Sequence, residues 1–204
     1  MRRRNAHTEV AAVCRHARAS LRVRFSLLLL SAILLGGFNR ANAQSVNSLS
    51  VAVTNVPGTF TLSVLPPYTS NTQPLGLQVS WDTNNKATRL EIWADFPSNT
   101  AFRSISTPAY TIAADAVEAQ SVSGCSVCSG GWTAFGTITD WAARPLGTPG
   151  AAFRIDSRSV KGNPRDSGTA NENVNLRVNL SRYFTTVAFA NDYRATLTIH
   201  VQVF

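Results

Sequence analysis

The segment Leu197-Thr-Ile-His-Val-Gln-Val203 alternates apolar and polar side chains along its whole length. Successive side chains of a strand point to opposite faces, so this alternation is typical of a strand with one buried face. Val174-Asn-Leu-Arg-Val-Asn-Leu180 repeats the pattern, and both segments contain residues that favour strands. Together they predict that the chain folds around β-sheets.

Further alternating segments lie towards the N-terminus. They predict strands at 49–53, 60–64, 75–81, 90–96, about 110–112 and 117–122. Asp82–Lys86 is rich in Asn and Asp, which favour turns, and predicts a hairpin between 75–81 and 90–96. We therefore predict an all-β fold, an antiparallel two-sheet sandwich of the immunoglobulin-like or pilin-like type. Residues 124–173 are rich in Gly, Pro, Ser and Asn, and we expect long irregular loops there with one or two short strands.

The N-terminal region has the three parts of a secretory leader in the right order. An Arg-rich start is followed by the apolar run Phe25–Phe38 and by the small-x-small site Ala41-Asn-Ala43. The apolar run has about 14 residues, whereas a membrane-spanning helix needs about 20. We predict a signal peptide at 1–43, cleavage between Ala43 and Gln44, and a single domain at 44–204 without a transmembrane segment. The product is expected in the periplasm, at the cell surface or outside the cell.

The basic charge of the chain belongs mainly to this leader. Eight of the nineteen basic residues and one of the eleven acidic residues lie in 1–43, which leaves the remaining chain a net charge of about +1. Arg154, Arg158, Lys161 and Arg165 are interrupted by acidic residues, and we expect them in a solvated loop. A nucleic-acid partner would require a sustained basic stripe, so none is predicted.

Two cysteines, Cys125 and Cys128, remain after the predicted cleavage. In an oxidising compartment the simplest interpretation is a short structural disulfide. The same spacing occurs in redox dithiols and in half of a zinc site, but zinc would need two more ligands and the mature chain has one histidine and no other cysteine. We therefore predict no metal site and no cofactor.

No catalytic residue can be assigned from the sequence. His200 is the one mature histidine, lies on the polar side of its strand, and is expected to be solvated. No Gly-x-Ser-x-Gly motif accompanies it. The spacing of the carboxylates selects no glycosidase pair, and we expect them to be surface charges. They are Asp82, Glu91, Asp95, Asp140, Asp156, Asp166, Glu172 and Asp192.

Trp93 is the candidate ligand contact. It lies on the face of its strand opposite Leu90 and Ile92, so the alternation points it away from the main core. An outward tryptophan can stack on a sugar ring or anchor a protein contact. The alternative is that the long loops of 124–165 cover it.

The ending Asp192-Tyr-Arg-Ala-Thr-Leu-Thr-Ile-His-Val-Gln-Val203 places a tyrosine before an alternating final strand. It resembles the ending of secreted bacterial β-sandwich modules of the fimbrial-subunit and spore-coat-protein-U-like type. The resemblance implies an extracellular structural or adhesive subunit without a catalytic site. Fimbrial subunits usually have a disulfide that joins distant strands, which Cys125 and Cys128 cannot supply.

Strand addition is one physical route by which such a subunit assembles with itself or with other surface subunits. Gln44–Val53 would begin the mature chain and alternates, so it is the segment expected to complete a neighbour's sheet. The alternative is that Leu49, Val51 and Val53 pair within their own sheet.

The sequence therefore favours an exported, non-enzymatic structural or adhesion protein of the cell surface or of an appendage. The second hypothesis is a small secreted carbohydrate-binding module that uses Trp93 to bind a glycan. The third is a hydrolase whose site the sequence does not locate.

Overall fold

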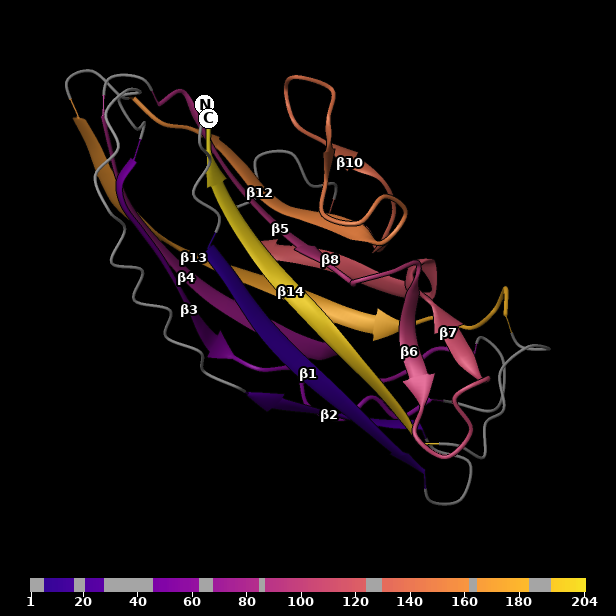
Figure 1. Ribbon diagram of the computed structural model, residues 1–204. Helices are drawn as coiled ribbons and strands as arrows, with labels where there is room; N and C mark the ends of the chain where they lie inside the picture. Colours follow the sequence, from indigo (N-terminus) through magenta and orange to yellow (C-terminus); the bar gives the residue numbers. More distant parts are fainter. Residues whose placement is uncertain are drawn as a thin grey trace, which may run out of the picture.

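The computed structural model describes residues 6–16, 21–27, 46–62, 68–84, 87–123, 130–161, 165–183 and 192–204. Within them two antiparallel sheets face each other (Figure 1). The first contains, in spatial order, β12 (Ala152–Ser159), β5 (Arg89–Asp95), β14 (Tyr193–Val203), β1 (Ala6–His16) and β2 (Leu21–Leu27). The all-β, two-sheet prediction is confirmed.

Two short strands, β6 (Thr100–Ser104) and β7 (Thr111–Ala113), extend the first sheet beside β14. The second sheet has the order β3 (Val46–Asn55), β4 (Gln73–Asn84), β13 (Arg165–Val178), β8 (Val117–Ser123) and β9 (Thr133–Ala134). A 3-10 turn, η1 (Ala114–Ala116), precedes β8, and β10 (Ile138–Thr139) pairs with β11 (Pro145–Leu146) in a small hairpin. Among the described residues, no helix has the length and apolar character needed to cross a membrane.

The core lies between the two sheets and is built by the alternating apolar positions. Each inner strand contributes one face to it, because residues two apart share a face. The first sheet supplies Leu90, Ile92, Leu197, Ile199 and Val201, and the second supplies Leu75, Leu77, Val79, Val174, Leu176 and Val178. All of these side chains are buried.

The hairpin predicted between 75–81 and 90–96 is wrong. Both segments are strands, but β4 pairs with β3 and β13, whereas β5 pairs with β12 and β14. The chain therefore changes sheets after Asn84. Alternation shows which side chains are buried, but it does not specify the partner of a strand.

Two other parts of the sequence prediction differ from the structure. The region 124–173 contains more regular structure than expected, because β12 and the first half of β13 lie in it. The described part of 60–64 forms an isolated bridge, Leu62 with Ser70, in place of a strand.

β14 has strands on both sides. On one side it pairs with β5 through Thr198–Val203 and with β6 through Tyr193–Ala195. On the other side β1 runs antiparallel to it from Ala6 opposite Val201 to Val13 opposite Arg194 (Figure 1). β1 and β2 lie within the predicted signal peptide, so cleavage after Ala43, which stays a prediction, would remove both.

Candidate functional site

Trp93 lies on the outer face of the first sheet, away from the main core, as its position in the alternation predicts. Its side chain is nevertheless only 3% exposed. It packs with Leu146, Phe204 and the partly buried Ile138 in a second, smaller apolar cluster. Leu146 and Ile138 belong to the β10–β11 hairpin, which therefore covers the tryptophan. A ligand would reach this ring only if the hairpin moved.

His200 and Asp95 connect the same hairpin to the sheet. The His200 ring stacks on Trp93 with 5.2 Å between centroids and 9° between planes, and its Nε2 contacts Asp95 Oδ1. Asp95 Oδ2 accepts hydrogen bonds of 3.1 Å from both the backbone N–H and the hydroxyl of Thr148. Gly147 has a φ of +67° and lies so close to Asp95 that a Cβ there would be 2.7 Å from the Asp95 Cβ. The solvated state expected for His200 is therefore wrong.

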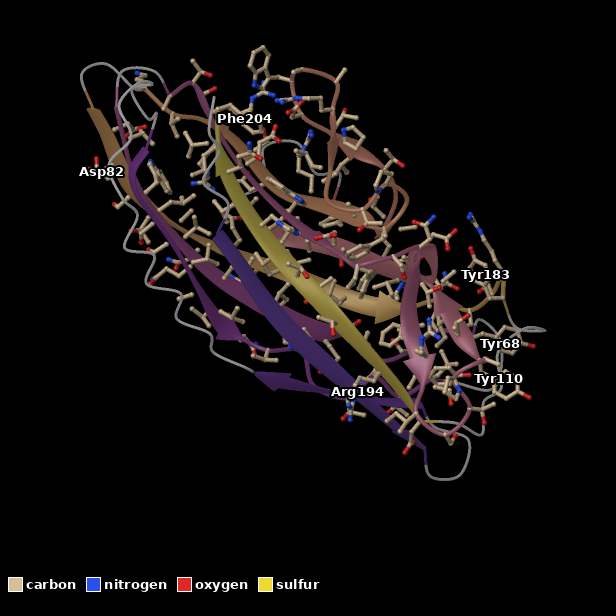
Figure 2. The ribbon with its side chains drawn as sticks, in the orientation of Figure 1. Tyr68, Asp82, Tyr110, Tyr183, Arg194 and Phe204 are labelled. Atoms are coloured by element: carbon tan, nitrogen blue, oxygen red, sulfur yellow. The ribbon has the colours of Figure 1, made fainter. Side chains whose placement is uncertain are left out.

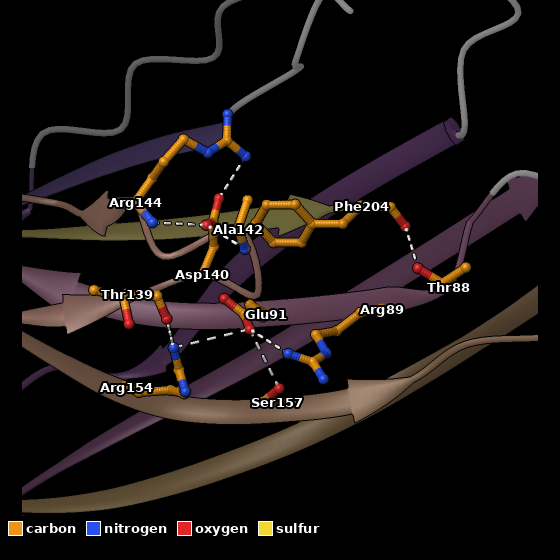
Figure 3. Close-up of polar contacts among 10 residues, drawn as sticks. All are labelled: Thr88, Arg89, Glu91, Thr139, Asp140, Ala142, Arg144, Arg154, Ser157 and Phe204. Atoms are coloured by element: carbon orange, nitrogen blue, oxygen red, sulfur yellow. Dashed lines mark hydrogen bonds and ion pairs between the residues drawn. The ribbon is translucent and has the colours of Figure 1, made fainter.

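The hairpin is also fixed internally by Asp140. Its buried carboxylate accepts hydrogen bonds from the backbone N–H groups of Ala142 and Arg144, at 2.9 and 3.0 Å, and pairs with the Arg144 guanidinium at 2.6 Å (Figure 3). A carboxylate that accepts backbone N–H groups across a turn holds the turn in one conformation. The hairpin that covers Trp93 is therefore held together by its own hydrogen bonds.

Glu91 lies on the same strand and the same face as Trp93 and Asp95. Its carboxylate is fully buried and lies 3.5 Å from Arg89 Nη1, 3.5 Å from Ser157 Oγ and 3.9 Å from Arg154 Nη2 (Figure 3). Arg154 Nη2 also donates to the carbonyl of Thr139 in the hairpin. Glu91 and Asp95 are therefore structural groups under the cover, contrary to the expectation of surface charges.

A second buried ionic group lies between the two sheets. Asp156 on β12 and Glu172 on β13 are 0% and 1% exposed, and Arg158 forms ion pairs with both. The guanidinium carbon of Arg158 also lies 5.5 Å from the centre of the Trp81 ring. The expectation that Arg154 and Arg158 belong to a solvated loop is wrong, because both lie on β12 and are held by carboxylates.

The pKa of Glu172 is raised from 4.5 to about 7, mainly because burial penalises the charged carboxylate. The charge of Asp156 contributes to this rise, and the Arg158 guanidinium opposes both effects. A proton on Glu172 leaves one negative charge on the pair, which the single Arg158 guanidinium neutralises. The pair therefore joins the sheets in a way that depends on protonation.

Gly168 makes room for the aromatic side of this group. It lies directly opposite Trp81 on the neighbouring strand, and a Cβ at Gly168 would be 2.5 Å from Trp81 Cζ2. We expect Gly168→Ala to lower the free energy of unfolding by about 1–3 kcal/mol, because the ring must move from its place beneath Arg158. Urea unfolding measures the change. Gly131→Ala is the control, since nothing lies within 4 Å of a Cβ there, and an equal loss in both variants would contradict the steric argument.

The remaining predicted site residues lie outside the described part of the chain. These are Cys125 and Cys128 of the predicted disulfide and Ala43 and Gln44 at the predicted cleavage site. Among the residues that are described, no three His, Cys, Asp or Glu side chains are grouped so as to hold a metal ion.

Comparison with known proteins adds little to this geometry. No protein-family model matches the chain, and no curated protein matches it. Among solved structures, the chain is similar to the CooA pilin subunit from enterotoxigenic Escherichia coli, with 12% sequence identity and a TM-score of 0.21 over 75% of this chain and 70% of that chain. A likeness at this level assigns no function.

Proposed function

We propose that this chain is an exported, non-enzymatic β-sandwich subunit of the cell surface or of an appendage, which assembles by strand addition at the β14 edge. The observation that carries the proposal is the pairing of β1 with β14. This pairing supports β14 as a strand that can take up an antiparallel partner, and the partner here belongs to the predicted leader.

Removal of the leader would leave one side of β14 without a partner between Arg194 and Val201. A row of unpaired N–H and C=O groups on an edge strand is a template for pairing with another chain. The other side of β14 stays occupied by β5 and β6, and its alternate side chains stay in the core. The edge left by the proposed cleavage would therefore keep its place in the sheet, and strand addition would supply affinity through the main chain.

The donor proposed from the sequence is Gln44–Val53 of a neighbouring copy. In the structure the β3 part of this segment pairs with β4, with Val51 opposite Val79. In the single chain this segment therefore pairs within its own sheet, as the alternative predicts. Leu49, Val51 and Val53 are only partly buried there, so the segment can leave β4 at a modest cost in apolar contact.

We expect deletion of Gln44–Val53 from the secreted protein to abolish multimers and to leave a folded domain. Analytical ultracentrifugation measures assembly, circular dichroism measures folding, and mass spectrometry of the secreted protein fixes its N-terminus. If multimers persist in a folded deletion variant, this segment is not the donor.

A competitor peptide tests the acceptor edge separately. A synthetic peptide with the sequence of residues 6–16, with Ser at Cys14, should cap β14 and convert multimers into single subunits. The same peptide with Val10→Pro is the control, because proline removes a ladder donor in the middle of the strand. Multimers that resist the first peptide as they resist the second would overturn assembly through β14.

A further inference from the structure

A surface hollow lies at the point where β14 changes partner. β14 pairs with β5 as far as Thr198 opposite Asp95, and β6 takes over at Ala195 opposite Phe102. The chain between β5 and β6 leaves the sheet at this point, which opens a hollow of about 350 Å³. Its lining includes Ser98, Thr100, Arg103, Ile105, Arg194 and Thr196.

Two arginines lie side by side in the lining of this hollow. Arg194 on β14 lies directly opposite Arg103 on β6, and both are exposed. Figure 2 shows Arg194 at the end of β14 that lies beside β6. Side chains directly opposite on antiparallel strands are neighbours, so like charges there oppose the fold. Both side chains are exposed, so burial in the core does not offset this repulsion.

The two arginines differ from others of the described chain in having no carboxylate partner within it. Arg103 Nη1 has a long contact of 3.4 Å with the carbonyl of Pro108, and no ion pair of Arg194 is formed with a described residue. Five other arginines are paired with carboxylates. These are Arg89, Arg144, Arg154, Arg158 and Arg177.

The lining favours one class of anionic ligand. Guanidinium groups bind carboxylates and sulfates by donating two parallel N–H groups to two oxygens of the anion. Ser98, Thr100 and Thr196 line the same hollow and are hydroxyl residues that match sugar hydroxyls, and Ile105, 48% exposed, provides an apolar rim. Binding of an acidic peptide would require a free strand edge or an apolar groove at this place. β6 is paired on both sides, with β14 and with β7, so it offers no free strand edge at this place. The hollow is open and its lining mixes polar and apolar surface, which suits the hydroxyls and the apolar C–H faces of a saccharide.

We propose that Arg103 and Arg194 form a binding site for an acidic saccharide, a uronate or a sulfated sugar. The two guanidinium groups hold the carboxylate or sulfate, and the hydroxyls of the hollow contact the ring. This site is separate from the covered Trp93 and lies on the face of β14, not on its paired edge.

Binding of defined oligosaccharides to the full chain tests the proposal. We expect tetragalacturonate or a chondroitin sulfate tetrasaccharide to bind in isothermal titration calorimetry, and a neutral cello-oligosaccharide not to bind. Arg103→Gln and Arg194→Gln should each weaken binding by about tenfold or more, because a bidentate contact to a charged group is lost. Arg194→Lys should weaken binding almost as much as Arg194→Gln, because lysine keeps the charge without the paired donors.

Arg177→Gln is the matched control, because Arg177 is partly exposed on the other sheet and is paired with Glu118. It should bind the saccharide as the parent chain does, and circular dichroism should show that every variant is folded. Three results would overturn the proposal: no binding of either acidic saccharide, equal binding by the parent and both glutamine variants, or equally tight binding of oligoglutamate. The last would assign the hollow to acidic peptides.

Discussion

Arg158→Met should lower the free energy of unfolding by about 3–5 kcal/mol at pH 8, since it leaves two buried carboxylates without their cation. Asp156 and Glu172 are almost fully buried, and Arg158 is paired with both. Methionine keeps much of the packing volume against Trp81, so the loss measures the charge more than the contact area. Urea unfolding at a series of pH values measures it.

The sign of the pH dependence follows from the raised pKa of Glu172. Its pKa is about 7 in the folded chain against 4.5 for the ordinary group, so the folded state binds the proton more tightly. In the parent chain the stabilising effect is complete below about pH 4.5 and is lost as the pH rises towards 7. With each pKa unit worth about 1.4 kcal/mol and some solvent screening, we expect roughly 1–3 kcal/mol over this range.

Removal of the cation should shift this loss to higher pH, because Arg158 is the group that lowers the pKa of Glu172. The deficit of Arg158→Met should therefore shrink on acidification to about pH 5, as Glu172 takes up a proton. Glu172→Gln should flatten the slope of the parent. Arg177→Met is the control, since its partner Glu118 is more exposed. A deficit in Arg158→Met that is the same at pH 5 and pH 8 would contradict the electrostatic role.

Trp93→Ala should also cost about 3–5 kcal/mol, the usual loss for a buried tryptophan. The ring is the centre of the small cluster with Leu146 and Phe204 and the surface on which His200 stacks. Its removal should free the β10–β11 hairpin before the main core opens. Hydrogen exchange of the 136–151 backbone, followed together with urea unfolding, measures both effects.

Trp141→Ala is the matched control, because Trp141 lies in the same hairpin and is 64% exposed. Its effect should stay within about 0.5 kcal/mol, as for other surface substitutions. If the two tryptophan variants unfold alike, Trp93 does not hold the cover in place.

The sequence predicted strands well because alternation records burial directly. Leu197–Val203 and Val174–Val178 lie within β14 and β13, and each places its apolar residues in the core. The predicted hairpin failed because turn residues after Trp81 mark a change of direction, and the same residues serve a crossing between sheets. Only the pairing of distant segments decides between the two.

The buried charges were harder to predict, although one signal was available. Glu172 is in phase with Val174 and Leu176 on β13, so the alternation that places these two inward places the glutamate inward too. Its partner could not be found in this way, because Asp156 lies in a region without clear periodicity. The same holds for Arg103 and Arg194, which are 91 positions apart and meet only through the register of β6 with β14.

The order of pairing also has a consequence for biosynthesis. β5 needs β12 and β14, and β4 needs β13, so neither sheet can form until segments some 60 to 110 positions further along the chain have been made. Such non-local topologies fold slowly, because long loops must close before their contacts stabilise them. A nascent polypeptide of this kind lacks its complete sheets until β14 has been made, as the export proposed above would require.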